Sequence, residues 1–419
     1  MTASEHNITI LGGNFAGLSI THYLLRHTIP ALDASDRSKT YKVTVVCPSS
    51  HFFFKVGAPR LVSPELAPID KAFIPINDGF KHYSKDRFCF VQGEATELKE
   101  DKRIITVKLT ESGDTIVVPY DSLVFATGTT SKSALWTLHG SHLKTRAAFQ
   151  DLLPRLPEAQ SITVVGGGPA GVETAGELGA QYGRKKDITI LSGSTRLLHR
   201  LRPAISSDAA SHLSKLSVTV THNLKVESSF LNERTGQTQL SLSDGSTIST
   251  DIFIDATGGT PNTSFLPASW LTPKGYVETD VKTLRATAAG PNVYAVGDVA
   301  SYSLGGILDV NNAIVPLAST ISVDLSSLSS PAETNEMPHD KNNGGLRSFC
   351  PSSTAPTPKQ KLYDQSLTET QIVPIGPKGG VGAVFGWRVP SWFVWALKSR
   401  TYMFEKAEEL VMGVDYVKA

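Results

Sequence analysis

A glycine-rich turn in the middle of the chain has the spacing that binds a pyrophosphate. Gly166-Gly-Gly168-Pro-Ala-Gly171 follows an apolar, β-branched run, residues 161–165, and precedes helical apolar spacing. Gly166 allows a tight turn, Gly168 lets a phosphate approach the backbone, and Gly171 lets a helix pack close to the strand. The free N–H groups at such a helix start favour anions. This turn therefore predicts a dinucleotide-binding site.

A second turn of this kind, Gly12-Gly13-Asn14-Phe-Ala16-Gly17, lies near the N-terminus. Asn14 stands where the pattern has its second glycine, and its side chain would crowd a phosphate that approaches the backbone. Two interpretations remain open, a second dinucleotide site and a turn that is only structural. The intact copy elsewhere in the chain favours the first.

A carboxylate stands where another apolar run ends, in Tyr294-Ala-Val-Gly297-Asp298. In open α/β sheets the carboxyl edge is where ligands are bound. A strand that ends in an ordinary Gly-Asp turn would have the same sequence. Asp298 is therefore a candidate ligand-binding residue, with a plain turn as the alternative.

These residues need two strand–helix–strand units to position them. The apolar patterns predict strands over 8–12, 42–46, 161–165 and 188–191, and helices over 18–26 and about 171–182. Each unit is followed by an apolar run that ends in Ala-Thr-Gly, at Thr127-Gly128 and again at Gly258. The predicted fold class is α/β, with two interleaved Rossmann-like dinucleotide-binding domains and a small C-terminal α+β domain.

The domain boundaries follow from these repeats and from a change in composition. A segment rich in Ser, Pro, Asn and Thr interrupts the chain after the second Gly-Asp run. Such a composition buries little apolar surface, so we expect it to stay mobile. The predicted parts are 1–130 with 275–325 for the first domain, 131–274 for the second, 326–371 for the low-complexity flexible insertion and 372–419 for the C-terminal domain.

Composition excludes several classes of protein. Lys+Arg 40 against Asp+Glu 39 argues against a nucleic-acid partner, since no strong basic excess is present. The 3 cysteines, at Cys47, Cys89 and Cys350, are too scattered for a disulfide scaffold or a zinc site, and we expect no metal. The first residues lack the pattern of a signal or transit peptide, and no long apolar stretch predicts a membrane span. We therefore expect a cytoplasmic protein.

These motifs together resemble the pyridine nucleotide-disulfide oxidoreductase superfamily. The two glycine turns, the two Ala-Thr-Gly runs, Gly259-Thr-Pro-Asn-Thr263 and the Gly297-Asp298 ending carry this resemblance. The helix sequence from Gly166 to Glu177 and the later Ala396-Leu-Lys-Ser-Arg400 are similar to the apoptosis-inducing-factor-like, ferroptosis-suppressor type of NAD(P)H:quinone oxidoreductase. The resemblance implies FAD in the first domain and NAD(P)H in the second.

The resemblance also assigns roles to individual residues. Glu173, Lys55 and Lys398 become candidate catalytic residues: a Glu173–Lys55 ion pair is expected near the flavin, and Lys398 would place a cation at the flavin that stabilises its reduced form. Surface charges solvated by water are the alternative for Glu173 and Lys55. The candidate cofactor-binding residues are Gly12, Gly13, Asn14, Ala16, Gly17, Lys55, Arg60, Ala95, Thr127, Gly128, Gly166, Gly168, Gly171, Glu173, Ser192, Arg196, Gly258, Gly297 and Asp298.

Two departures from the family pattern bear on the chemistry. Cys47 and Ser192 stand where an acidic residue usually binds a ribose, and Arg196 follows Ser192 closely. Loss of the carboxylate favours NADPH, or use of both cofactors, unless Arg196 is only a surface charge. No cysteine pair is spaced to relay electrons, so we expect electrons to pass from the flavin directly to the acceptor.

The sequence therefore predicts an FAD-dependent NAD(P)H oxidoreductase that reduces a quinone-like acceptor without a redox-active disulfide. One alternative is an NAD(P)H-binding flavoprotein that acts as a signalling protein, as apoptosis-inducing factor does. Another is an oxidoreductase of specialised metabolism with one dedicated substrate. The Trp-rich segment from Gly386 to Trp395 reads either as a packed hairpin or as a peripheral membrane contact that admits a quinone.

Overall fold

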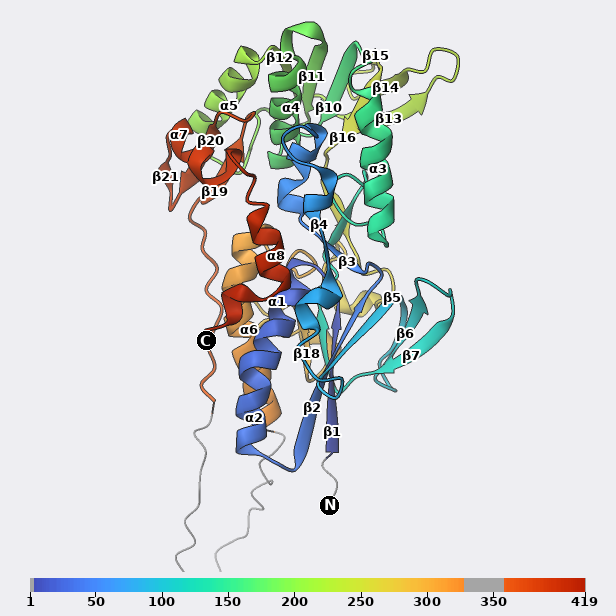
Figure 1. Ribbon diagram of the computed structural model, residues 1–419, viewed down its shortest axis with the longest axis vertical. Helices are drawn as coiled ribbons and strands as arrows, with labels where there is room; N and C mark the ends of the chain where they lie inside the picture. The colour runs from blue at the N-terminus through green and yellow to red at the C-terminus, as the bar shows by residue number, and fades with distance from the viewer. Residues whose placement is uncertain (1–3, 328–357, 419) are drawn as a thin grey trace, which may run out of the picture.

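A computed structural model describes residues 4–327 and 358–418, and its larger sheet has seven strands (Figure 1). Five strands run parallel, and the last two turn back as antiparallel neighbours. In spatial order they are β18 (Val293–Ala295), β8 (Ser122–Phe125), β1 (Ser4–Leu11), β2 (Lys39–Cys47), β5 (Phe88–Lys99), β6 (Ile104–Leu109) and β7 (Thr115–Pro119). Because β18 joins strands that lie far earlier in sequence, the Gly297-Asp298 turn returns to the first sheet.

Helices α1 (Phe15–Tyr23), α2 (Ile29–Ser35) and α6 (Ile307–Ser327) pack beside this sheet (Figure 1). The helix predicted over 18–26 is longer in the structure, because the π-helical turn Leu24–Thr28 joins α1 to α2 without a break. Buried Ile29 and Leu32 hold the extension against the core.

The second sheet has four parallel strands, β12 (Val218–His222), β11 (Asp187–Ser192), β10 (Ser161–Val165) and β16 (Ile252–Asp255). Helices α3 (His142–Arg155), α4 (Pro169–Tyr182) and α5 (Pro203–Lys215) lie in the same part of the molecule, as Figure 1 shows. A small antiparallel sheet follows, made of β13 (Val226–Leu231), β14 (Thr238–Leu242) and β15 (Thr247–Thr250). The predicted α/β class with two dinucleotide-binding sheets is confirmed, whereas the exact domain boundaries stay a prediction.

Two short antiparallel pairs connect the parts. β9 (Thr129–Ser131) pairs with β17 (Gly259–Pro261), so the segments after the two Ala-Thr-Gly runs lie side by side. The Asn262 amide donates to the Thr127 carbonyl at 2.8 Å and fastens this junction. The other pair joins β3 (His51–Phe53) to β4 (Phe73–Pro75), and the 3₁₀ segment Lys55–Val62 lies between them in sequence.

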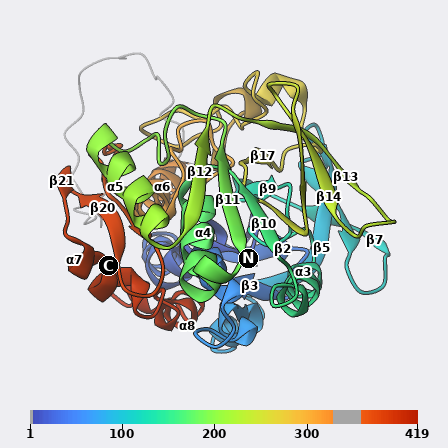
Figure 2. The same cartoon turned by 90° about the horizontal axis from the view of Figure 1, so that it is seen from above.

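The C-terminal part forms a small module at one edge of the molecule (Figure 2). It contains β19 (Gln371–Pro374), β20 (Gly380–Val384), β21 (Trp387–Arg388), α7 (Ser391–Val394), the π-helical turn Trp395–Ser399 and α8 (Glu405–Val411). No helix among the described residues combines the length and the hydropathy that a membrane crossing needs.

Only part of the predicted flexible insertion can be compared with the structure. Residues 328–357, which include Cys350, lie outside the described residues. The described stretch from 358 onward packs along α6, where buried Tyr363 donates its hydroxyl proton to Asp309. Gln360 and Lys361 add hydrogen bonds to Thr320 and Ser319 of α6, so several contacts hold a stretch that its polar composition had suggested to be mobile.

Candidate active site

The two glycine turns have the same construction. Gly12 and Gly166 have φ values of 117° and 125°, which L-residues with a side chain rarely adopt. A Cβ at Gly17 would lie 1.8 Å from the Gly12 carbonyl oxygen, and one at Gly171 would lie 1.9 Å from that of Gly166. The glycines thus let α1 and α4 begin directly against their strands, and at α4, where no side chain caps the helix start, the first N–H groups can meet a phosphate.

Asn14 and Gly168 occupy equivalent places and differ in what they allow. The Asn14 side-chain oxygen accepts the Phe15 N–H at 2.9 Å, and its amide donates to the Phe53 carbonyl at 3.3 Å. A Cβ at Gly168 would meet no atom within 4 Å, so a ligand can approach this backbone freely. Asn14 therefore caps α1 through hydrogen bonds within the protein, and its side chain occupies the space that stays open at Gly168.

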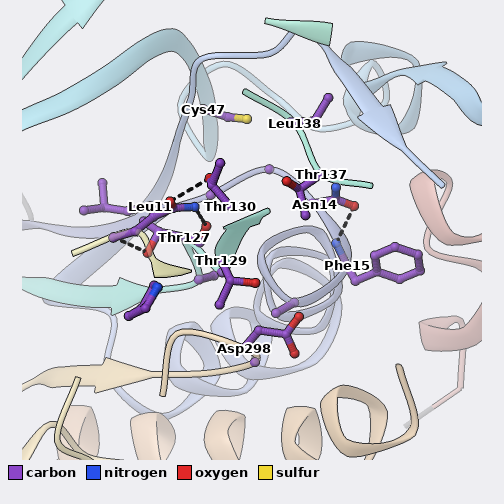
Figure 3. A pocket seen from close by; sticks show the side chains of 18 of the residues that line it. Leu11, Asn14, Phe15, Cys47, Thr127, Thr129, Thr130, Thr137, Leu138 and Asp298 are labelled. Atoms are coloured by element: carbon purple, nitrogen blue, oxygen red, sulfur yellow. Dashed lines mark hydrogen bonds between the residues drawn. The ribbon is translucent and has the colours of Figure 1, made fainter. Parts of the chain in front are cut away.

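A cavity of about 500 Å³ opens beside the first turn, between the first sheet, the start of α6 and the β9–β17 junction (Figure 3). Ten predicted cofactor-binding residues line it: Gly12, Gly13, Asn14, Ala16, Lys55, Ala95, Thr127, Gly128, Gly297 and Asp298. The sequence had not assigned to it several further lining residues, among them Glu94, Asn262, Phe265 and Ile307. Asn262 carried a signal, since it belongs to the Gly259–Thr263 motif.

Asp298 presents an unsatisfied oxygen at this cavity. Its Oδ2 accepts a hydrogen bond from Lys55 Nζ at 2.8 Å, whereas its buried Oδ1 has no partner among the described residues. Burial alone would raise the pKa of Asp298, but the charge and hydrogen bond of Lys55, together with a backbone hydrogen bond from Gly306 and the charge of Arg200, hold it below its ordinary value. An ionised, half-satisfied carboxylate suits a ligand that brings hydroxyl donors, as the ribityl chain of FAD does.

Glu173 and Lys398 form a buried ion pair in which Lys398 Nζ lies 2.7 Å from Glu173 Oε1. Burial raises the pKa of Glu173, and Lys398 opposes the shift. The expected Glu173–Lys55 pair is wrong, because Lys55 turns to Asp298 and the C-terminal π-helical turn supplies Lys398 in its place. Sequence proximity could not reveal this, since 225 positions separate the true partners.

A second buried pair lies one helical turn further along α4. Arg60 Nε is 2.9 Å from Glu177 Oε2, and both side chains are almost fully buried. The Arg60 guanidinium also stacks 4.4 Å from the Tyr402 ring centroid and donates to the Ser399 carbonyl at 2.8 Å. Burial raises the pKa of Glu177 to about 7, against the opposing charge of Arg60. Arg60 was expected to bind a cofactor, and it does not line the cavity around Asp298.

The loop after β11 carries the residues expected to choose between NADH and NADPH. Ser192 is buried, and a Cβ at Gly167 would lie 2.4 Å from its Oγ, so it sits directly against the second glycine turn. Arg196 donates from Nη2 to the His199 carbonyl at 2.8 Å, while its Nη1 has no partner among the described residues. Gly258, another predicted cofactor-binding residue, lies outside this loop, directly before β17. A Cβ at Gly258 would meet no atom within 4 Å.

Comparison with known proteins agrees with this geometry. The model of the pyridine nucleotide-disulphide oxidoreductase family matches residues 6–316. The chain belongs to this family. It is therefore an oxidoreductase that binds FAD and NAD(P)H, and the two glycine turns, the cavity and the unsatisfied Asp298 oxygen fit those groups.

Several relatives of this oxidoreductase match over most of the chain. Oxidoreductase phnG of Penicillium herquei is 34% identical over 99% of this chain and 98% of its own length. Apoptosis-inducing factor 1 of Saccharomyces cerevisiae is 24% identical, covering 98% and 99%. Ferroptosis suppressor protein 1 of Homo sapiens is 25% identical, covering 70% and 74%. The solved sulfide:quinone oxidoreductase of Aquifex aeolicus has a TM-score of 0.61 at 15% identity, covering 77% of each chain, and supports the fold.

We expect Asp298→Ala to weaken FAD binding. Loss of a buried charge-assisted hydrogen bond costs about 1–3 kcal/mol, which is roughly a 5- to 150-fold rise in the dissociation constant. Flavin content after purification and fluorescence titration of the apoprotein measure this change. Asp208→Ala removes an ion-paired carboxylate outside the cavity and serves as the control. Equal FAD affinity in both variants would show that Asp298 does not contact the flavin.

Proposed function

We propose that this oxidoreductase transfers two electrons from NAD(P)H to a quinone-like acceptor without a redox-active disulfide. The balanced reaction consumes NAD(P)H, one proton and the quinone, and it yields NAD(P)⁺ and the quinol. Bound FAD supplies the redox chemistry between the two substrates. The protein residues bind and orient the rings, exclude water and hold the proton.

The placement of the cysteines is the observation that carries this proposal. In the parallel pair β2–β5, Cys47 lies opposite Gln92 and Cys89 lies opposite Thr44. The two thiols are therefore offset by three residues, about 10 Å along the strands, whereas a disulfide needs Cα atoms about 6 Å apart. Cys350 lies outside the described residues, and no C-x-x-C occurs in the sequence. An acceptor that takes electrons directly from the flavin needs no thiol.

Three features of the site support this chemistry. The start of α6, at Ile307, lines the cavity and turns the positive end of a long helix toward it, which favours negative charge there. Lys55 and Asp298 form one ion pair at this cavity. Glu173 of α4 forms another with Lys398 of the C-terminal π-helical turn. The buried Glu173 carboxyl, whose pKa is raised, is a group that can hold the proton the reaction consumes.

Rapid mixing without oxygen tests the proposal. NADPH should bleach the flavin absorbance of the protein, and a water-soluble benzoquinone should restore it in a second mix. Bleaching without reoxidation by any quinone would contradict the proposal and favour a protein that senses NAD(P)H through partner binding.

A dedicated small-molecule acceptor is the second candidate. The two fungal relatives named oxidoreductases, phnG and ptaL, are 34% and 31% identical along nearly all of both chains, more than the apoptosis-inducing-factor and ferroptosis-suppressor relatives. Under this candidate, common quinones should be poor acceptors, and a screen of aromatic metabolites should reveal one that reoxidises the flavin much faster.

We expect NADPH to serve at least as well as NADH, and Ser192→Glu to shift the preference to NADH. A carboxylate at this position would repel the 2′-phosphate and bind the ribose hydroxyls, whereas the wild type has no carboxylate there and carries the cation Arg196 four positions further along the loop. The ratio of kcat/KM for the two nucleotides measures the change, with Ser192→Thr as the uncharged control. A strong wild-type preference for NADH would show that other groups contact the ribose.

A further inference from the structure

The small C-terminal module exposes large apolar side chains at unusual density. Phe385 and Trp387 are 77% and 79% exposed, Trp392 is 67% exposed, and Trp395 and Leu397 are 41% and 46% exposed. Single exposed apolar residues are ordinary on protein surfaces, but five within 13 positions are not. We call these five residues the aromatic surface.

Adjacent elements carry the aromatic surface. Trp387 lies in β21, paired with Val384 of β20, and Phe385 stands in the turn between these strands. Trp392 lies in α7, which packs on β20, and Trp395 and Leu397 lie in the π-helical turn that continues α7. Figures 1 and 2 both place these elements at one edge of the molecule, where β20 packs against α5.

The stretch of the module that carries the aromatic surface has charges of one sign. Residues 370–404 contain no Asp or Glu and four basic residues, Lys378, Arg388, Lys398 and Arg400. Arg388 pairs with Asp208 of α5, and Lys398 pairs with Glu173. Lys378 and Arg400 form no ion pair within the described part of the chain, and the Arg400 guanidinium lies 5.9 Å from the Trp395 ring. The surroundings of the aromatic surface therefore favour an anionic partner.

We propose that the aromatic surface docks this oxidoreductase peripherally on an anionic lipid bilayer. Tryptophan prefers the boundary between lipid headgroups and acyl chains, and basic residues beside it are attracted to anionic lipids. A second copy of this chain is the alternative occupant of the aromatic surface, and light scattering in the test below distinguishes it from a bilayer. Docking by a few side chains is reversible and needs no membrane span.

The position of the surface also suggests which acceptors reach the site. Trp395 and Leu397 belong to the same helical turn as Lys398, whose ammonium group contacts buried Glu173. A lipid-dissolved quinone that leaves the bilayer at the aromatic surface would thus arrive beside the Glu173–Lys398 pair. This second step rests on the proposed function, whereas the docking itself does not.

Vesicle flotation with the FAD-loaded protein tests the docking. The wild type should float with phosphatidylglycerol-containing vesicles and much less with pure phosphatidylcholine. The double variant Trp387→Ser, Trp392→Ser should lower the partition coefficient at least about tenfold, given the apolar area lost. The double variant Phe230→Ser, Leu231→Ser removes two exposed apolar residues from the remote β13 hairpin and should bind as the wild type does.

Three results would overturn the docking proposal. The first is no flotation of the wild type, and the second is equal flotation of both double variants. The third is a wild type that light scattering shows to be a dimer, together with a tryptophan variant that is a monomer. Reduction of a water-soluble benzoquinone separates this proposal from the proposed function. That activity should persist in the tryptophan variant, while reduction of a vesicle-embedded long-chain quinone should fall. Flotation without any quinone reduction would leave docking standing and the proposed function wrong.

Discussion

Replacing Lys398 with methionine should slow quinone reduction by about ten- to a hundredfold. Lys398 is the only cation that the structure places within hydrogen-bonding distance of Glu173 among the described residues, at 2.7 Å. The family resemblance implies that this cation stabilises the reduced flavin; one charge-assisted interaction contributes roughly 1.5–3 kcal/mol, and each 1.4 kcal/mol corresponds to tenfold in rate. FAD content should stay near the wild-type level, because Lys398 does not line the cavity around Asp298. Stopped-flow flavin absorbance measures both half-reactions.

A second variant identifies the cause of the slowing. Lys398→Met leaves Glu173 as a buried carboxyl without its partner, so its pKa should rise further and it should stay protonated. In the double variant Lys398→Met, Glu173→Gln, position 173 no longer carries a carboxyl. If the double variant recovers the wild-type rate, the unpaired carboxyl caused the slowing, and the cation itself has no catalytic role. If it stays slow, the positive charge is needed.

Replacing Arg60 with methionine should destabilise the fold by about 3–5 kcal/mol, the typical cost of removing one partner of a buried ion pair. Arg60 joins the 3₁₀ segment that carries Lys55 to α4 and to Tyr402, so three segments lose a common contact. The double variant Arg60→Met, Glu177→Leu should recover much of this loss, because apolar side chains can fill the space. Thermal unfolding at saturating FAD measures both.

The Arg60→Met deficit should widen above pH 7. A carboxyl whose pKa is raised by folding contributes stability that is lost as pH rises from its unfolded value, near 4.5, to its folded value, about 7 in the wild type. Without Arg60 the folded pKa of Glu177 rises further, so the variant keeps losing stability where the wild type no longer does. Lys406→Ala breaks the exposed pair with Glu409 and should change stability by less than about 1 kcal/mol at every pH. A deficit independent of pH would assign the loss to packing alone.

The sequence predicted those elements well in which the local residue pattern matches the backbone geometry that the element requires. The two glycine turns are such a case, because positive φ values and close helix packing leave glycine as the one suitable residue at Gly12 and Gly166. Strand β10 agrees with its predicted range, since an apolar β-branched run bounded by a glycine turn admits few alternatives. The interleaving of the two domains could be predicted, because the Gly297-Asp298 run follows the completed second strand–helix–strand unit.

Side-chain pairing was harder to predict, because it depends on contacts between distant segments. Lys398 reaches Glu173 only because the C-terminal module folds back onto α4, and no spacing in the sequence encodes that contact. Tyr402 was not singled out, although its ring covers Arg60 and its hydroxyl donates to Glu177 at 3.4 Å. Hydrophobic periodicity specifies which face of a helix is buried, but it does not name the polar partner that meets that face.

The most direct test of direct electron transfer is anaerobic stopped-flow on a cysteine-free protein. Cys47, Cys89 and Cys350 are replaced by alanine or serine, and flavin reduction by NADPH and reoxidation by a benzoquinone are followed at the flavin absorbance. The proposed function predicts that both rates stay within a few fold of the wild type, provided that FAD content shows the protein is folded. A folded, flavin-loaded, cysteine-free protein that is reduced by NADPH and cannot pass its electrons to the quinone would contradict it and require a thiol relay.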